Sequence, residues 1–381
     1  MNAGKFIFFW LPYPAKYSYH TFLTAYYVAL NKFPVDKAIH IGTPQLLNAL
    51  NPHFEYNGIG CPPMDTLKRV EKVYFDSHVF QKLENEKLTN HFTWASLMTE
   101  RNEAIENEIR PIIEKLVAKN NILGIVAWCN TPSLKAVAEE FGLKVIHNEM
   151  GPLRNPYYTH TAYFDFSGVN GNTECQKRFN SSFETIKEDV PVLSTGQILN
   201  LFGENPYMDE ISRPVSPEVH FGIPLQVEDD SNMLAYGRGF NNYELISWAR
   251  NTQEKFLVRK HPAGHVDYRE INDHSATPIE FIKRSSVIVT INSSVGLEAR
   301  LYSRKAVYLG DSPFKFLSTD FLTGTEPENL IEKINYAVFG YLIPFDYLYD
   351  YEYFSWRLTN PSERKIYETN LGYYLKKKEL L

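Results

Sequence analysis

The sequence has few cysteines and no excess of positive charge, and both absences narrow the class of protein. Its three cysteines, Cys61, Cys129 and Cys175, are far apart and form no Cys-x-x-Cys pair. This excludes a disulfide scaffold and a structural zinc site and favours a reducing compartment. The formal net charge is -6, which argues against nucleic acid as the main partner, because nucleic-acid binding needs a basic surface. An anionic ligand must therefore be bound by a local cluster of basic groups.

A long apolar run is also missing. No segment approaches the roughly 20 apolar residues of a membrane-spanning helix. The apolar start of the chain, residues 6–11, is shorter than the roughly 7–15-residue core of a signal peptide, and Pro12 and Pro14 end it. We expect residues 6–11 to form the first buried strand. The protein is then cytoplasmic, either free or peripheral at the inner face of the cytoplasmic membrane.

Aromatic residues are abundant, with 25 tyrosines and 25 phenylalanines. One interpretation is ordinary packing in the cores and on the surface. The other is that Tyr-rich stretches, at residues 156–158 and 347–353, provide platforms for sugar rings. Composition leaves both interpretations open.

Strand and helix patterns alternate in the first half of the chain. Residues 122–129 form an apolar strand, residues 133–141 a helix that ends at Gly142, and residues 144–147 the next strand. Such a βαβ unit implies parallel strands. Further expected elements are a helix over 19–30, a strand over 38–41 and a long surface helix over 94–119. Residues 150–220 are rich in Asn, Ser, Pro and Gly and are expected to be irregular.

A second series of alternating elements begins near residue 230. Expected strands are 233–236, 255–260, 286–291 and 305–309, and expected helices are 242–251, 279–283 and 296–302. The length of 381 residues also fits two domains of roughly 150–200 residues each. We therefore predict an α/β protein with two Rossmann-like domains that face a central cleft. The domains are residues 1–224 and 225–345, with a hinge at 222–230, and an aromatic and helical tail, 346–381, packs back on the first.

The segment Arg-Lys-His-Pro, from Arg259 to Pro262, ends one of the expected strands. Ligands of open α/β sheets bind at the carboxyl ends of strands. Arg259 offers a planar fork to phosphate oxygens, Lys260 offers a point charge and His261 adds an imidazole. The segment is either a phosphate-binding turn or an ordinary loop.

A second turn, Asn292, Ser293 and Ser294, leads from an expected strand into a helix. The positive end of a helix dipole and its N–H groups bind anions, and serine hydroxyls add donors. The alternative is an ordinary helix cap. Together with the His-Pro segment on a neighbouring strand, this turn predicts one phosphate between the two. Gly296 belongs to the same turn, and Glu298, one turn into the helix, faces either ribose hydroxyls or solvent.

Carboxylates occur at two further strand ends. Glu228, Asp229 and Asp230 stand just before the expected strand 233–236, at the predicted hinge, and Glu149 follows the strand 144–147. Carboxylates in a cleft can serve as nucleophile, general base or metal ligand. The alternatives are a solvated acidic linker and a loop acid.

These motifs together resemble those of bacterial transferases that use CMP-activated sugars, among them several sialyltransferase families. They are more similar to the β-Kdo transferases of capsule and O-antigen synthesis. Those enzymes carry a Gln-x-x-x-Asp segment, a basic His-Pro turn and a Thr-Ile-Asn-Ser-Ser-Val-Gly-x-Glu-Ala segment. Here the three stand at Gln226 to Asp230, Arg259 to Pro262 and Thr290 to Ala299. The resemblance covers residues 220–312 well and the first half thinly.

The resemblance implies a GT-B-like fold and a retaining, metal-independent transfer of Kdo from CMP-β-Kdo to a glycan acceptor, with no cofactor. Asp230 would be the carboxylate nucleophile, with Asp229 the less favoured choice, and Glu149 the acid/base. His261, with Lys260, Ser293 and Ser294, would stabilise the departing CMP phosphate. Kdo has a carboxylate of its own, so Arg259 or Lys260 would alternatively bind that group.

Three other functions remain open: an inverting sialyltransferase that uses CMP-sialic acid, a CDP-glycerol-type phosphotransferase, and a non-catalytic module that binds a glycan or a nucleotide. The pattern also suits a domain of a larger polypeptide. The lysines at residues 376–378 either contact anionic lipid or end a solvated helix.

Overall fold

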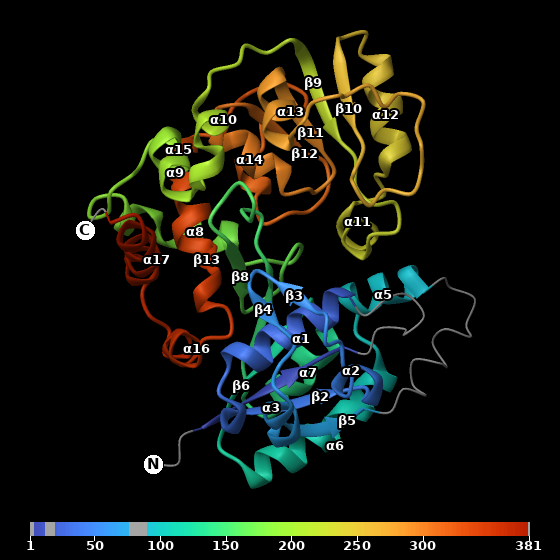
Figure 1. The fold of residues 1–381 in the computed structure, drawn as a ribbon, viewed down its shortest axis with the longest axis vertical. Coiled ribbons are helices and arrows are strands. Elements are labelled where there is room, and N and C mark those ends of the chain that lie inside the picture. The colour runs from blue at the N-terminus through green and yellow to red at the C-terminus, as the bar shows by residue number, and fades with distance from the viewer. Residues whose placement is uncertain (1–3, 12–19, 76–89, 380–381) are drawn as a thin grey trace. The chain divides into compact units, whose positions relative to one another are not determined.

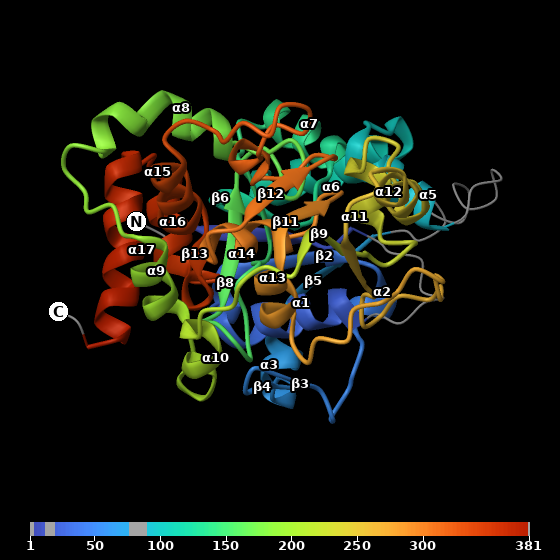
Figure 2. The ribbon, with the colours of Figure 1, turned by 90° about the horizontal axis from the view of Figure 1, so that it is seen from above.

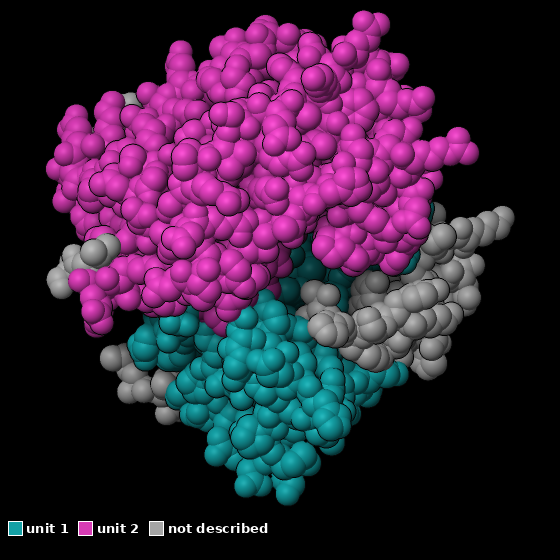
Figure 3. Space-filling view, turned by 45° about the horizontal axis from the view of Figure 1, so that its top comes forward, with its two compact units in different colours: residues 1–149, 164–169, 346–361 teal, residues 150–163, 170–345, 362–381 magenta. Residues whose placement is uncertain are grey.

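The computed structural model describes residues 4–11, 20–75 and 90–379; Pro12, Pro14 and the expected helix start at Tyr19 lie outside them. The chain divides into two compact units (Figure 3). Unit 1 comprises residues 1–149, 164–169 and 346–361, and unit 2 comprises residues 150–163, 170–345 and 362–381. The chain thus first passes into unit 2 after Glu149, whereas the sequence placed a boundary after residue 224. The tail contributes to both units.

The larger sheet has the strand order β13-β8-β7-β6-β1-β2-β5. Its strands β7, β6, β1, β2 and β5 are parallel, and β8 and β13 are antiparallel to each other. The strands are β1 (Lys5–Phe9), β2 (Ala38–Gly42), β5 (Glu71–Tyr74), β6 (Ile122–Trp128), β7 (Val145–Met150), β8 (Thr161–Asp165) and β13 (Ile343–Pro344). The predicted first strand and βαβ unit are confirmed.

The helices of unit 1 include a correction. The expected helix over 94–119 is two helices, α5 (Asn90–Thr99) and α6 (Glu103–Lys119), because the side chain of Asn102 accepts the N–H of Ile105 at 3.2 Å and starts a new helix. The other elements of this unit are α1 (His20–Lys32), η1 (Val35–Lys37), α2 (Pro44–Leu47), β3 (Glu55–Tyr56), β4 (Ile59–Gly60), α3 (Met64–Arg69), α7 (Pro132–Glu140), η5 (Phe345–Tyr347, which begins at the border with unit 2) and α16 (Tyr351–Leu358).

Unit 2 contains a four-stranded, fully parallel sheet of order β10-β9-β11-β12. Its strands are β9 (Val219–Pro224), β10 (Phe256–Arg259), β11 (Ser285–Thr290) and β12 (Lys305–Tyr308). The predicted strand 233–236 is wrong, because these residues lie in helix α11 (Ser231–Tyr236). The predicted hinge at 222–230 is also wrong for residues 222–224. These residues belong to β9, which is held in the sheet between β10 and β11.

The region 150–220, which was expected to be irregular, contains three helices: α8 (Cys175–Ile186), α9 (Thr195–Phe202) and α10 (Met208–Ser212). Helix α9 starts at a capping box, in which Ser194 and Gln197 each bond the other's backbone N–H. The remaining elements of unit 2 are η2 (Asn205–Tyr207), α12 (Asn242–Asn251), α13 (Pro278–Arg284), α14 (Val295–Leu301), η3 (Lys315–Leu317), α15 (Leu330–Asn335), the π-helix η4 (Tyr336–Tyr341) and α17 (Glu363–Lys377).

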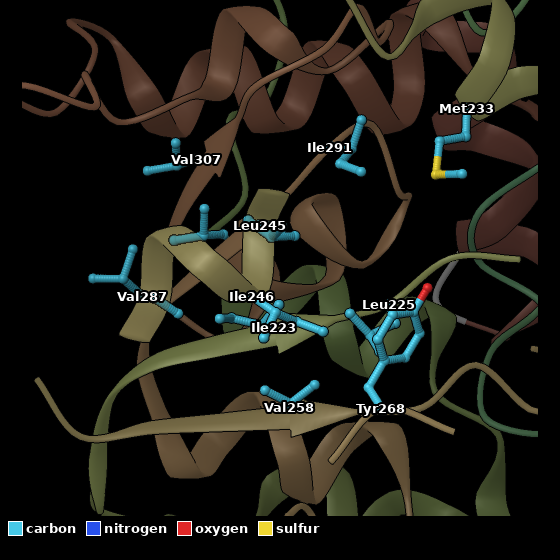
Figure 4. Close-up of a cluster of buried hydrophobic side chains, with 12 residues drawn as sticks. Ile223, Leu225, Met233, Leu245, Ile246, Val258, Tyr268, Val287, Ile291 and Val307 are labelled. Carbon is cyan, nitrogen blue, oxygen red and sulfur yellow. The ribbon is translucent and has the colours of Figure 1, made fainter. Parts of the chain in front are cut away.

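The core of unit 2 lies between its sheet and helix α12 (Figure 4). Ile223 from β9 and Val258 from β10 pack with Leu245 and Ile246 from α12, all at most 4% exposed. Helices α13 and α14 also pack against this sheet. Parallel strands joined by helices that cover the sheet form a Rossmann-like unit, so the predicted α/β class with two Rossmann-like units is confirmed.

The aromatic residues mostly build the cores. Trp10, Tyr26 and Tyr349 are at most 1% exposed, and the indole N–H of Trp10 donates to Nδ1 of the buried His40 at 3.1 Å. In the Tyr-rich stretch 347–353, Tyr349 and Tyr353 are buried. The packing interpretation therefore holds for the buried aromatic residues of this stretch.

The C-terminal helix α17 packs against α8, α9 and η4 within unit 2 (Figures 1 and 2). Its last turn carries two lysines of the group 376–378, and the third, Lys378, donates from Nζ to the carbonyl oxygen of Gly203 at 2.7 Å. Lys378 thus fastens the end of α17 to the end of α9. Within the described ranges, no helix has the length and apolar character needed to cross a membrane.

Candidate functional site

The predicted site motifs of unit 2 follow three strands of one sheet. The segment from Gln226 to Asp230 comes after β9, His261 after β10, and the serine turn after β11. Because these strands are parallel and β9 lies between β10 and β11, their continuations emerge at one edge of the sheet. The strand-end placement is confirmed, but the His-Pro and serine turns are not on neighbouring strands. The missed strand β9 separates them, and its own continuation carries the acidic segment.

Gln226 and Asn292 bind each other and join two of these turns. The side-chain amide of Gln226 donates to Oδ1 of Asn292 at 2.8 Å, and the backbone N–H of Asn292 donates to Oε1 of Gln226 at 3.2 Å. Nδ2 of Asn292 donates to the carbonyl of Asn232 at 3.1 Å. Both side chains are buried. Asn292, predicted as a ligand-binding residue, is therefore placed to hold the turns in position.

Two of the three consecutive carboxylates bind the loop that follows β10. Glu228 accepts the backbone N–H of His265 at 2.9 Å and that of Val266 at 3.4 Å. These bonds help to lower the pKa of Glu228, although burial opposes them. Asp229 lies 3.5 Å from Nε2 of His265. The acidic segment is thus not a solvated linker, because its first two members fasten the loop beyond His261.

Asp230 caps a helix, and among the three carboxylates its charge acts most strongly on His261. Its Oδ1 accepts the N–H of Asn232 at 2.8 Å and caps helix α11. Burial lowers the pKa of His261, and the nearby Asp230 charge partly offsets this. Nδ1 of His261 accepts the N–H of Ala263 at 3.1 Å, so the neutral ring carries its proton on Nε2. His261 is therefore a hydrogen-bond donor beside a carboxylate.

The two cations that precede His261 are paired within unit 2. Nη1 of Arg259 lies 2.6 Å from the carboxylate of Asp273, which is fully buried, and donates to the carbonyl of Ser275 at 3.0 Å. Nζ of Lys260 pairs with the carboxylate of Asp267. Both side chains thus have anionic partners within unit 2, and their role toward a phosphate stays a prediction.

The serine turn uses its own groups to bond the first amides of α14. The hydroxyl of Ser293 accepts the N–H of Val295 at 3.3 Å, and its carbonyl accepts the N–H of Gly296 at 3.2 Å. The hydroxyl hydrogen of Ser293 remains available for donation, and Ser294 is the N-cap residue of the helix. A Cβ on Gly296 would lie 2.3 Å from the ring of Tyr308. Glycine is therefore needed here for packing of α14 on β12.

Glu298 points into the protein and not into solvent. It is 9% exposed. Burial raises its pKa to about 7, although a hydrogen bond from Tyr158 and the charge of Arg154 oppose the rise. The hydroxyl of Tyr158 lies 2.9 Å from that of Tyr302, the residue that follows the end of α14. Of the two alternatives for Glu298, burial excludes the one in which it faces solvent, and a role toward ribose stays a prediction.

Arg154 is the residue that the sequence analysis missed, and Tyr157 and Tyr158 beside it were considered only as part of a Tyr-rich stretch. They belong to the segment Met150–Tyr163, which is part of unit 2 although it lies in the first half of the chain. The charge of Arg154 lowers the pKa of both His261 and Glu298. The only sequence signal in this segment was the Tyr-Tyr pair, which indicated a possible platform for sugar rings but not the residues that it contacts.

Glu149 lies in β7, close to the carboxyl end of that strand, as expected. It is the last residue of the first segment of unit 1, whereas Asp230 belongs to unit 2. Its assignment as acid/base stays a prediction. Among the described residues, no three histidine, cysteine or acidic side chains are grouped as metal ligands would be.

The buried carboxyl of Glu298 predicts a pH-dependent stability. Its pKa is about 7 in the folded protein and near 4.5 when exposed, so folding favours its protonated form. The stabilisation of the folded state by the protonated carboxyl of Glu298 is complete below pH 4.5. It is lost as the pH rises through 7. Between pH 5 and 8, the free energy of unfolding of unit 2 should fall by about 2–3 kcal/mol more in the unchanged protein than in Glu298→Gln.

Urea unfolding at several pH values measures this difference. Glu328→Gln is the matched control, because Glu328 is exposed and its loss should leave the pH dependence unchanged. Identical pH profiles for the unchanged protein and Glu298→Gln would show that Glu298 is ionised in the folded state at pH 5.

Comparisons with known proteins give one family match. Residues 5–174 match the family described as the Glycosyltransferase 99 family N-terminal domain. This match lies in the first half, whereas the motifs at the edge of the unit 2 sheet lie between Gln226 and Ala299. It ends beyond Glu149 and Arg154 and so includes both.

Among curated proteins, the chain is similar to "Protein FixF" of Sinorhizobium fredii (strain NBRC 101917 / NGR234). The two are 28% identical over 106 residues, which is 24% of this chain and 26% of that protein. The chain therefore matches about a quarter of the length of this relative.

Among solved structures, the chain is similar to two from Thermosulfurimonas dismutans. KpsC, beta Kdo 2,7 transferase, has a TM-score of 0.44 and 16% identity, over 66% of this chain and 89% of that one. KpsC, beta Kdo 2,4 transferase, has a TM-score of 0.34 and 14% identity, over 65% of this chain and 92% of that one.

Proposed function

We propose that the chain is a glycosyltransferase that moves Kdo from CMP-β-Kdo to a glycan acceptor, with retention, in the synthesis of a bacterial O-antigen or capsule. The family match of residues 5–174 supports glycosyl transfer. One observation supports the chemistry most strongly. Three parallel strands bring a carboxylate, Asp230, an imidazole, His261, and a serine turn to the same sheet edge.

In the first step, a carboxylate oxygen of Asp230 attacks the anomeric carbon of Kdo. The bond from that carbon to the phosphate oxygen breaks, and its electron pair leaves with CMP. Nε2–H of His261 and the hydroxyls of Ser293 and Ser294 donate to the departing phosphate. Such preorganised donors stabilise charge that develops in the transition state. The cap bond from Asn232 to Asp230 holds the nucleophile in one orientation.

In the second step, the acceptor hydroxyl attacks the same carbon, and the bond to Asp230 breaks with its electron pair returning to the carboxylate. Glu149 takes the proton of the hydroxyl. Two displacements at one carbon give net retention. A neutral His261 suits this cycle, because it donates a hydrogen bond without needing to change its protonation state.

A covalent adduct is the expected signature of this mechanism. When the protein is incubated with CMP-Kdo and no acceptor, intact-mass spectrometry should show one Kdo residue added, and peptide mapping should place it on Asp230. Parallel incubations with CMP-sialic acid and CDP-glycerol, read by released nucleotide, test the other donor classes. Nucleotide release without any adduct would instead indicate an inverting transferase. A protein that binds the nucleotide but releases nothing would be a binding module.

A further inference from the structure

The donor of the proposed function, on which this inference rests, has two anionic groups: the phosphate and the carboxylate of the sugar. The sequence predicts that the His-Pro segment and the serine turn bind the phosphate and, as an alternative role, that Arg259 or Lys260 binds the sugar carboxylate. Each of these side chains pairs with a carboxylate of unit 2, Arg259 with the fully buried Asp273 and Lys260 with Asp267. A cation of unit 2 that has no such anionic partner is therefore the better candidate for binding the donor.

The segment Met150–Tyr163 brings such a cation to the sheet edge. The backbone of this segment is fixed, because the N–H of Gly151 donates to the carbonyl of Thr161 at 2.9 Å and the N–H of Tyr158 donates to the carbonyl of Arg154 at 3.2 Å. The hydroxyl of Tyr158 lies 2.9 Å from that of Tyr302, the residue at the end of α14. Arg154 is thus one backbone turn away from Tyr158, whose position is set by its contact with Tyr302.

Arg154 is exposed, and its guanidinium forms no ion pair with any residue of the described ranges. Its charge is nevertheless close enough to lower the pKa of His261 after β10 and of Glu298 on α14. The contact between Tyr158 and Tyr302 places this segment beside the end of α14, and the charge of Arg154 reaches both Glu298 on that helix and His261. The charges of Arg154 and of a protonated His261 repel each other, and an anion bound near both would offset this repulsion.

We infer that Arg154 binds an anionic oxygen group of the donor beside His261. A guanidinium presents two parallel N–H groups that match the two oxygens of a carboxylate or a phosphate. Asp230 supplies the attacking oxygen and His261 a donor to the leaving group. Arg154 then sets the preference for acidic donors.

Isothermal titration of CMP and of CMP-Kdo against three variants tests this role. Arg154→Gln removes the charge, and Arg154→Lys keeps a charge without the planar fork. Arg269→Gln is the matched control, because Arg269 is also an exposed arginine of a unit 2 loop. Loss of a charge-assisted hydrogen-bonded pair should weaken binding by about 10- to 100-fold. Arg154→Lys should retain part of the affinity, and Arg269→Gln all of it.

The two ligands separate the two anionic groups. If Arg154 binds the phosphate, Arg154→Gln weakens both CMP and CMP-Kdo. If it binds the sugar carboxylate, only CMP-Kdo weakens. Unchanged affinity for both ligands in Arg154→Gln would overturn the inference. An equal loss of affinity in Arg154→Gln and Arg154→Lys, together with a lower melting temperature of both variants, would also overturn the inference. It would show that Arg154 has a structural role. Failure of the unchanged protein to bind either ligand would contradict the proposed function itself.

Discussion

Replacement of Asp230 by asparagine is expected to lower the rate of Kdo transfer by roughly 10³- to 10⁴-fold, because it removes the nucleophile and its charge. The change is otherwise conservative. Asparagine keeps an Oδ1 that can accept the N–H of Asn232, so the cap of helix α11 is retained. The loss should therefore appear in kcat with the melting temperature unchanged. Released CMP, measured with an acceptor present, gives the rate.

Asp229→Asn is the control at the next position. Oδ1 of Asp229 lies 3.5 Å from Nε2 of His265, and the side chain of Asp229 is 43% exposed. Because exposed ion pairs contribute little, Asp229→Asn should change the rate of transfer by less than 10-fold. A severe loss in Asp229→Asn with activity kept in Asp230→Asn would exchange the two assignments. Equal activity in both variants and the unchanged protein would rule out a carboxylate nucleophile in this segment.

The sequence predicted best those elements that have both periodicity and a start signal. Helix α12 has the predicted bounds, 242–251, because Asn241 and Glu244 form a capping box before an apolar face. Strand β9 was missed, although Val219, Phe221 and Ile223 alternate, since Gly222 and Pro224 interrupt the pattern. The short apolar run 233–236 was read as a strand, because four residues cannot distinguish a strand from a helix turn.

The site could be predicted only as far as the strand ends. Parallel strands bring their carboxyl ends to one edge, so Asp230 and His261 could be placed near each other. Their partners could not, because ion pairs such as Arg259 with Asp273 depend on the path of a loop. Arg154 was not predictable, since its position depends on the contact between Tyr158 and Tyr302, 144 residues apart in the chain.

Replacement of Arg300 by methionine should lower the free energy of unfolding of unit 2 by about 3–5 kcal/mol, the range for a broken buried ionic network. Arg300 lies on α14, behind the serine turn, and is 2% exposed. Its guanidinium donates to the carbonyl of Leu317 at 2.6 and 2.8 Å and to the hydroxyl of Thr319 at 2.8 Å. It also pairs with Glu326 at 2.9 Å. Methionine would leave the buried carbonyl of Leu317 and the buried hydroxyl of Thr319 without this donor.

Arg364→Met provides the comparison, because Arg364 also forms two ion pairs but is 46% exposed on α17. Exposed pairs contribute about 0–1 kcal/mol, so this variant should differ little from the unchanged protein. Urea unfolding, followed by hydrogen exchange of peptides from β11 and β12, measures both variants in unit 2. Because α14 begins at the serine turn, Arg300→Met should also weaken CMP binding, and Arg364→Met should not. Equal stability of the two variants would mean that the network around Arg300 contributes no more than an exposed pair.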